Sequence, residues 1–193
     1  DEAVGQMLTK LREKRRRDNR PMPRLVTFGI RDEMSPAAQT ADAAYTARNL
    51  VYEQGVPCFD LWHNDRYACS VRLQIPGRHN VLNALAAVAC AHQNDAGFAA
   101  AARVLDHYQG AEGRFTDVGH YRGARVIADY AHHPAAARVT LAAARLLPHK
   151  HLWVVFQPLT FSRVRVLFDD YVAALQDCGR IIFSDIYSDR EPI

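Results

Sequence analysis

Residues 129–134, with the sequence Asp-Tyr-Ala-His-His-Pro, bring together side chains whose types could do chemistry. The apolar run 124–128 precedes them, and the Ala/Leu-rich segment 135–147, with apolar residues at helical spacing, follows them. In an open parallel sheet, this passage from strand to helix lies at the edge where ligands bind. The alternative is a polar loop whose two histidines only cap the following helix.

Within this stretch, Asp129 follows its strand directly and could accept hydrogen bonds from ribose hydroxyls, as acids at strand ends do in nucleotide-binding sheets. A second strand end, 156–163, places Arg163 on the same rim, so His132, His133 and Arg163 could form an anion pocket. Alternatively, Arg163 pairs with an aspartate of the following helix. We expect no metal site, because two adjacent histidines lack a third ligand nearby.

Two asparagines and one arginine are further candidates. Asn80 and Asn83 are three residues apart in the first turn of an expected helix, so they share a face, and an asparagine amide suits the N6/N7 edge of adenine. Gly77 just before them would allow a close approach to the backbone. Arg114 follows a glycine-rich stretch and could bind phosphate or carboxylate. The alternatives are a capping and a solvated asparagine, and a surface arginine.

Composition excludes several classes of protein. The 193 residues are 49% hydrophobic and carry a net charge of only +3, which is typical of a globular protein. The basic run 12–17 is expected to be the solvated end of a helix, so we predict no nucleic-acid partner. No apolar run reaches membrane-spanning length, and the four cysteines show no CxxC spacing, which fits a reducing cytoplasm.

Periodicity predicts two kinds of organisation. Before residue 109 we expect helices over 1–17, 81–92 and 98–108, strands over 25–28, 58–62 and 67–75, and an ambiguous segment, 41–52. After a linker at 109–113 we expect strands over 116–120, 124–129, 151–156 and 180–186, and helices over 134–147 and 164–177. The second pattern alternates strand and helix, which indicates an α/β unit with a parallel sheet.

Four motifs resemble those of the Mur ligases. Residues 77–87 are similar to the signature G-x-HN-x-x-NALAA, and 108–115 to the family's F-x-G-x-x-RRF junction. Residues 129–134 and 156–163 resemble DDYAHHP and FQPHxYSR. The segments 26–29 and 47–49 also resemble the family's central domain, so the similarity runs in order through nearly the whole chain.

The resemblance implies an α/β fold made of the end of a Mur ligase central ATPase domain, residues 1–112, and the start of a Rossmann-like C-terminal domain, residues 113–193. Both ends are expected to be cuts through a longer protein. The implied activity is ATP- and Mg²⁺-dependent amide formation through an acyl phosphate in peptidoglycan synthesis. The sequence holds no GxxxxGK[ST] loop, so we expect this chain alone to be inactive.

The resemblance also assigns roles to single residues. It places Asn80 and Asn83 on adenine, Asp129 on ribose and Arg114 on the phosphates. Tyr130, His132 and Arg163 are expected to line the amino-acid pocket, and Arg114 and His132 are expected to take part in catalysis.

The last two motifs indicate the branch of the family that joins L-alanine to UDP-N-acetylmuramate. The sequence departs from these motifs at Gly113, Ala128, Leu159 and Phe161, and Leu159 cannot donate the hydrogen bond that a histidine supplies. Two alternatives remain. One is the related ligase that reattaches a recycled tripeptide, and the other is a non-catalytic nucleotide-binding remnant.

Overall fold

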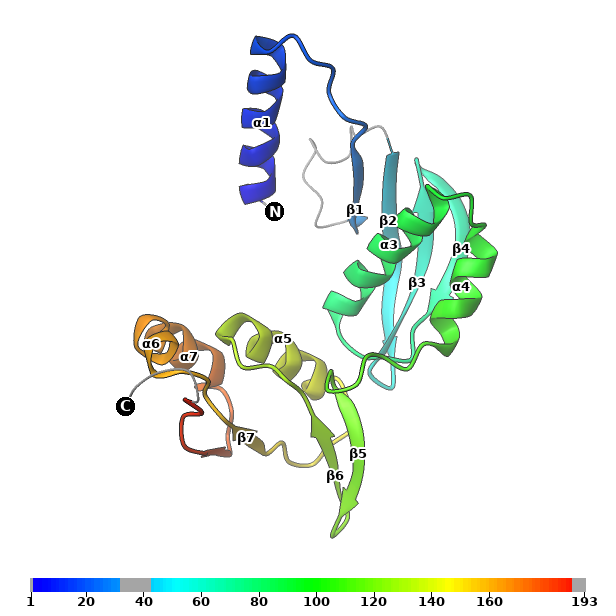
Figure 1. Cartoon of the computed structure of the whole chain (residues 1–193). Helices are drawn as coiled ribbons and strands as arrows, with labels where there is room; N and C mark the ends of the chain where they lie inside the picture. The colour runs from blue at the N-terminus through cyan, green and yellow to red at the C-terminus, as the bar shows by residue number, and fades with distance from the viewer. Residues whose placement is uncertain (1, 32–42, 189–193) are drawn as a thin grey trace.

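The computed structural model describes residues 2–31 and 43–188 (Figure 1). Its elements follow one another along the chain as α1 (Glu2–Arg17), β1 (Val26–Ile30), β2 (Ala43–Glu53), β3 (Val56–His63), β4 (Arg66–Arg72), α3 (Arg78–His92), α4 (Phe98–His107), β5 (Thr116–Tyr121), β6 (Ala124–Ala128), α5 (Pro134–Arg145), β7 (Val154–Phe156), α6 (Phe161–Val166), α7 (Phe168–Leu175) and β8 (Ile181–Phe183).

A four-stranded sheet in the order β1-β2-β3-β4 forms the first half of the fold. β1 pairs with β2 in parallel, and β2, β3 and β4 form the expected antiparallel meander. The ambiguous segment 41–52 is a strand from residue 43, and residues 41 and 42 lie outside the described residues. Pro57, Phe59 and Leu61 of β3 alternate with less buried neighbours, so one face of the sheet is apolar.

Helix α3 covers that apolar face of the sheet. Val81 and Leu85, one turn apart, are both fully buried against sheet residues such as Tyr45 and Leu61. Full burial of each leucine or valine contributes about 1.5–3 kcal/mol relative to exposure. This core holds α3 in place, so the first turn of α3 has a fixed position at the end of the sheet (Figure 1).

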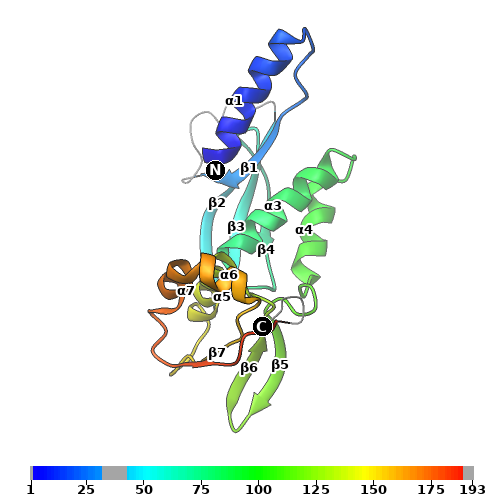
Figure 2. The same ribbon diagram turned by 60° about the vertical axis from the view of Figure 1, so that its left-hand side comes forward.

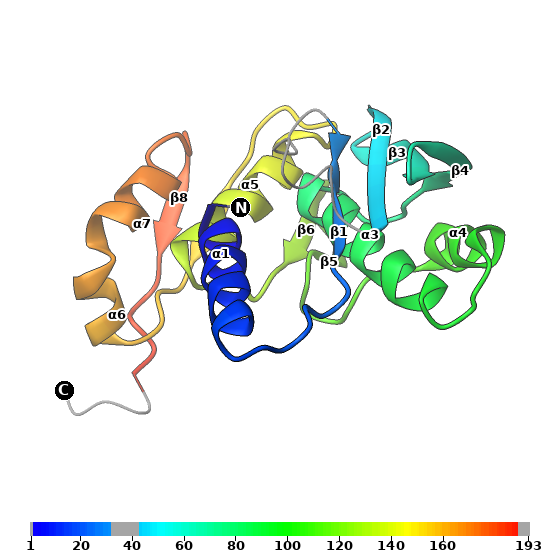
Figure 3. The same ribbon diagram turned by 90° about the horizontal axis from the view of Figure 1, so that it is seen from above.

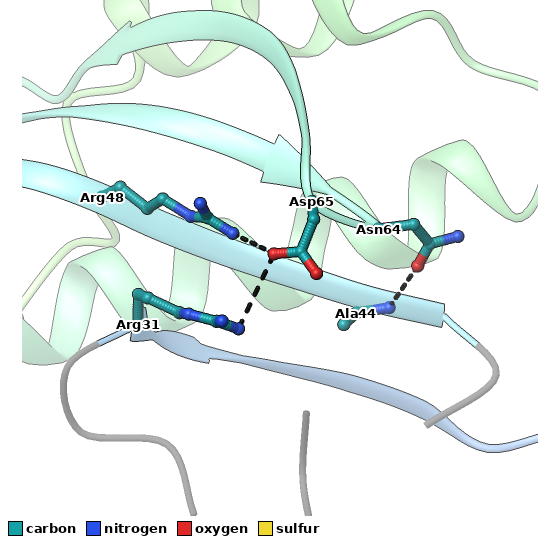
Figure 4. A network of polar contacts seen from close by, with 5 residues as sticks. All are labelled: Arg31, Ala44, Arg48, Asn64 and Asp65. Carbon is teal, nitrogen blue, oxygen red and sulfur yellow. Dashed lines mark hydrogen bonds and ion pairs between the residues drawn. The ribbon is translucent and has the colours of Figure 1, made fainter. Parts of the chain in front are cut away.

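The β3–β4 turn is fixed onto the sheet by polar contacts. Asp65 accepts from the guanidinium of Arg48 and lies 3.7 Å from Arg31 Nη1, and Asn64 Oδ1 accepts from the backbone N–H of Ala44 at 2.9 Å (Figure 4). The Arg48 guanidinium also stacks on Trp62, 4.2 Å from the ring centroid. These contacts join β1, β2 and the turn into one unit.

The second half of the fold contains two small sheets. β5 and β6 form an antiparallel hairpin that projects from the molecule (Figure 2), and β7 pairs with β8 in parallel. The alternation of strand and helix therefore predicted the α/β class correctly. However, β6 and β7 belong to different sheets in the described part of the chain, whereas the sequence pattern predicted a single parallel sheet.

One helix and one strand differ from their predictions. The single helix expected over 164–177 is two helices, α6 and α7, which meet at Leu167, where φ is −108° and ψ is 24°. Gly29, expected to form a turn, continues β1 to Ile30. Helix α1 lies apart from the sheet (Figures 1 and 2), and its apolar Met7 is 59% exposed. Among the described helices, none has both the length and the apolar character required to cross a bilayer.

Candidate nucleotide site

A cavity of about 690 Å³ lies where the two halves of the chain meet. Its walls come from the segment after β4, the first three turns of α3, the end of α4, the linker after α4, the end of β6 and one side of α5. It contains the four residues predicted to contact a nucleotide, which are Asn80, Asn83, Arg114 and Asp129. Its size and mainly apolar lining with a few polar groups are typical of a small-molecule site.

The two asparagines lie together on the first turns of α3. The N-cap of this helix is Gly77, so neither asparagine caps it. The Asn80 Nδ2 atom donates to the carbonyl oxygen of Pro76 at 2.8 Å, and the Asn83 Nδ2 atom donates to Asn80 Oδ1 at 3.2 Å. Asn80 thus orients Asn83, and both amides face the cavity.

Arg114 enters the cavity from the linker. The linker is fixed to the end of β6, because the Tyr130 N–H donates to the Gly113 carbonyl at 2.9 Å. The Arg114 guanidinium carbon lies 5.7 Å from the Tyr130 ring centroid. Its exposed head group can therefore reach a ligand in the cavity while its backbone is held.

Asp129 stands at the end of β6 and is half-buried. Its Oδ2 atom accepts from the Phe115 N–H at 3.1 Å and from the Thr140 hydroxyl at 3.2 Å. The carboxylate thus connects β6, the linker and α5, and its position on the cavity wall suits hydroxyl groups of a ligand.

His79 is a cavity residue to which the sequence reasoning gave no role, although it lies inside the quoted α3 motif. Burial lowers the pKa of its imidazole, and the nearby negative charge of Asp129 opposes that shift. The imidazole is therefore neutral near pH 7. Thr140 was also missed. Its only signal was its place on the helix after the Asp129 loop.

The two histidines of the loop after β6 make different contacts. His133 is the N-cap of α5, and its Nδ1 atom accepts from the Ala135 N–H at 3.2 Å, which is the capping alternative for this residue. His132 lies 3.0 Å from the Tyr130 carbonyl through Nδ1. Because a carbonyl only accepts, this contact places a proton on Nδ1 of His132. His132 therefore remains the histidine available to a ligand.

Arg163 lies on α6 near this loop. Tyr171 of α7 donates its hydroxyl to the His132 carbonyl at 2.8 Å. Burial raises the pKa of that hydroxyl, and the positive charge of Arg163 partly offsets the rise. The Nη1 atom of Arg163 is buried without a hydrogen-bond partner, and within the described residues Arg163 makes no ion pair with Asp169 or Asp170. This geometry suits an anion beside His132.

The resemblance of the motifs implies a metal ion as well as a nucleotide. The cavity fits the adenosine portion of a nucleotide, with apolar walls for a base and polar groups for its edge and ribose. The described ranges, 2–31 and 43–188, contain no group of three His, Cys, Asp or Glu side chains that could hold a metal ion. We therefore derive no step through Mg²⁺ from these residues.

Comparison with known domains identifies the class of protein. The profile of the Mur ligase middle domain matches residues 7–91. The profile of the Mur ligase glutamate ligase domain matches residues 113–192. The chain belongs to the Mur ligase family.

Its relatives are more specific. The UDP-N-acetylmuramate–L-alanine ligase of Alkaliphilus metalliredigens is 36% identical over 168 residues, which are 86% of this chain and 35% of that protein. The enzyme of the same name from Clostridium kluyveri is 36% identical over 175 residues, 90% of this chain and 38% of that protein. The chain thus spans about a third of the length of these relatives.

A solved structure supports the same fold. The crystal structure of the UDP-N-acetylmuramate–alanine ligase of Thermotoga maritima superposes with a TM-score of 0.67 and 26% identity, covering 84% of this chain and 37% of that one. The fold is therefore the α/β fold expected from the motifs, with matches to a Mur ligase middle domain and a Mur ligase C-terminal domain.

Proposed function

We propose that this chain is part of an ATP-dependent ligase that joins L-alanine to UDP-N-acetylmuramate in peptidoglycan synthesis. The observation that carries the proposal is the cavity that gathers Asn80, Asn83, Arg114 and Asp129 from separate motifs. The names of the relatives, which cover most of this chain, support the choice of substrates. A reaction that consumes ATP is expected in the cytoplasm.

In this proposal the cavity binds the nucleotide and orients it. The apolar walls exclude water from the adenine ring, and the amides of Asn80 and Asn83 recognise its edge. Asp129 accepts from the ribose, and Arg114 neutralises charge on the phosphate side, where negative charge develops during phosphoryl transfer. ATP supplies the phosphoryl group that activates the muramate carboxylate, and Mg²⁺ accompanies it.

The amino-acid pocket is proposed at Tyr130, His132 and Arg163. The guanidinium fork of Arg163 suits a carboxylate, because it offers two parallel donors. The Nε2 atom of the His132 imidazole is proposed to accept a proton from the amine of L-alanine as the amide forms. Leu159, in place of a donor, leaves Arg163 with a larger share of the anion binding.

The test uses a full-length ligase that contains this chain. Phosphate release from ATP is expected only when UDP-N-acetylmuramate and L-alanine are both present, together with formation of the amide product. If a tripeptide replaces L-alanine and gives the faster reaction, the recycling ligase is the correct assignment. If no amide forms with either amine while nucleotide binds, the chain belongs to a non-catalytic nucleotide-binding protein.

A further inference from the structure

Two β-hairpins of the chain are closed by turns of the same geometry. Gln54 and Gly55 join β2 to β3 with φ values of 52° and 90°. Arg122 and Gly123 join β5 to β6 with φ values of 49° and 82°. Two residues with positive φ form the turn that matches the twist of a hairpin, and it favours glycine at its second position. The backbone conformation therefore favours glycine equally at Gly55 and at Gly123.

The surroundings of the two glycines differ. A Cβ atom on Gly55 would lie 2.7 Å from Leu147 Cδ2 and 3.0 Å from the Leu146 carbonyl oxygen. A Cβ atom on Gly123 would have no neighbour within 4 Å. Leu146 and Leu147 follow the end of α5 in the second half of the fold, so the β2–β3 turn of the first half contacts them directly. Gly55 is thus required for a contact between halves as well as for its turn.

Gly77 makes a second contact of this kind. Its φ is 100°, and a Cβ atom there would lie 3.0 Å from Ala143 Cβ and 2.7 Å from His79 Cε1. Ala143 is only 1% exposed, yet it does not belong to the core of its own half, which includes Ala137 and Leu141 of the same helix. Its close neighbour in the first half of the fold is Gly77. The close approach expected at Gly77 is therefore, in this structure, the approach of α5.

The contacts fall on one side of α5. Ala136, Thr140 and Ala143 are separated by four and three residues, so they lie on one face of α5, and Leu147 follows the end of this helix. Ala136 and Thr140 line the cavity, while Ala143 and Leu147 contact the two glycines. Figures 1 and 3 show α5 between α7 and α3. The distance between α5 and α3 therefore sets the width of the cavity, because both helices line it.

We propose that Gly55 and Gly77 are positioning residues that together form a seat for α5 and set the width of the nucleotide cavity. The absence of a Cβ atom at both points lets the helix come close enough for Thr140 to hold Asp129 opposite Asn80 and Asn83. What the cavity holds rests on the proposed function, whereas the seating of α5 does not.

The experiment compares Gly55→Ala with the matched control Gly123→Ala in the 193-residue chain. Both substitutions place alanine in the same kind of turn, and only the first creates an overlap, which is with Leu146 and Leu147 after the end of α5. We expect amide hydrogen exchange over residues 136–147 to be about threefold or more faster in Gly55→Ala than in Gly123→Ala. AMP binding, measured by calorimetry, is expected to be about three- to tenfold weaker in Gly55→Ala and unchanged in Gly123→Ala.

A second pair of variants tests the contact from the α5 side without altering a turn. Leu147→Ala removes the side chain that packs on Gly55, and Leu146→Ala removes a neighbour that is 40% exposed. Faster exchange in α5 is expected only for Leu147→Ala. Equal amide exchange in both members of each pair would contradict the proposal that these contacts position α5. If the exchange responds as expected while the wild-type chain fails to bind AMP, the result supports the positioning of α5 by the two glycines and contradicts the proposed function. AMP binding that is equally tight in Gly55→Ala overturns the positioning role.

Discussion

At the scale of single residues, Asp129 shows how one side chain can serve both the fold and a site. One of its carboxylate oxygens accepts from the Phe115 N–H and the Thr140 hydroxyl, and so joins the linker to α5. A carboxylate held at two points offers a ligand a fixed acceptor, because little rotamer freedom remains to be lost on binding. Removing this carboxylate would therefore change both stability and binding, so Asp129 is a poor residue for a selective test.

Asn83 is a better residue for such a test. Asn83→Ala removes an amide proposed to contact adenine, and one neutral hydrogen bond contributes about 0.5–1.5 kcal/mol net. The Kd for AMP, measured by calorimetry, is thus expected to rise about two- to tenfold. The matched control is Asn94→Ala, which removes an amide that donates to Cys90 at the far end of α3. An equal effect of both variants would contradict the adenine contact.

Arg163 tests the amino-acid pocket. Arg163→Ala in a full-length ligase is expected to weaken the use of L-alanine about ten- to a hundredfold, because a charge-assisted bond contributes about 1.5–3 kcal/mol. The KM for ATP is expected to stay the same, and Arg163→Lys is expected to recover part of the loss. Arg165→Ala, an exposed arginine on the same helix, serves as the control. Equal losses for ATP and L-alanine would assign Arg163 a structural role.

The residue scale also shows what the sequence could and could not reveal. Motif positions indicated Asn80, Asn83 and Asp129 before any geometry was known, and all three line the cavity, while their contacts with a nucleotide remain predictions. The sequence could not show that His133, and not His132, caps α5, since this depends on which ring reaches the Ala135 N–H. His79 was missed because burial, which lowers its pKa, depends on the second half of the fold.

At the scale of elements, α7 supports the loop after β6. The Tyr171 hydroxyl donates to the His132 carbonyl from a side chain that is only 7% exposed. Tyr171→Phe keeps the ring and removes this bond, so the free energy of unfolding is expected to fall by about 0.5–1.5 kcal/mol. Urea denaturation measures this loss. Tyr67→Phe removes an exposed hydroxyl contact with Ser70 and is expected to have a smaller effect. If Tyr171→Phe lowers the free energy of unfolding no more than Tyr67→Phe does, the result would contradict the claim that Tyr171 stabilises the loop after β6.

The burial of His79 on α3 predicts a pH dependence of stability. Burial lowers the pKa of His79 in the folded chain, so below its unfolded pKa of about 6.5 the unfolded state binds more protons. Stability from the neutral ring is complete above that pH and is lost as the pH falls below it. His79→Gln is therefore expected to lower the dependence of the urea midpoint on pH between about 7.5 and 5.5.

The control for this experiment is His120→Gln, which replaces an exposed histidine of the β5–β6 hairpin. Burial also lowers the pKa of His63, so part of the pH dependence is expected to remain in His79→Gln. A pH dependence identical in the wild type, His79→Gln and His120→Gln would show that His79 is not buried as a neutral ring.

Periodicity predicted most elements because burial on one face decides them. The meander β2–β4 and the helices α3 and α4 each have a clear apolar pattern. The break between α6 and α7 at Leu167 was not predictable, since the segment is continuously compatible with a helix and contains no glycine or proline. The separation of β6 from β7 was also hidden, because strand pairing depends on tertiary packing and not on the pattern of either strand.

At the scale of the whole molecule, the cavity exists only because two halves meet. The linker between them has positive φ at Gly110 (94°) and Gly113 (72°), and Ala111 and Glu112 between them are exposed. That residues 110–113 form a hinge, and that the domain boundary lies between residues 112 and 113, remain predictions. A hinge here would let the cavity close over a nucleotide and exclude water.

The central claim is that this cavity holds the adenosine portion of a nucleotide, and NMR titration of the 193-residue chain with AMP tests it most directly. The account predicts that the side-chain amide signals of Asn80 and Asn83 and the backbone signals of Phe115 and Asp129 shift together and saturate with a single Kd. Adding ATP should give the same shifts without hydrolysis, because the sequence has no phosphate-binding GxxxxGK[ST] loop. Saturable shifts confined to another surface, or no shifts at all, would contradict the account.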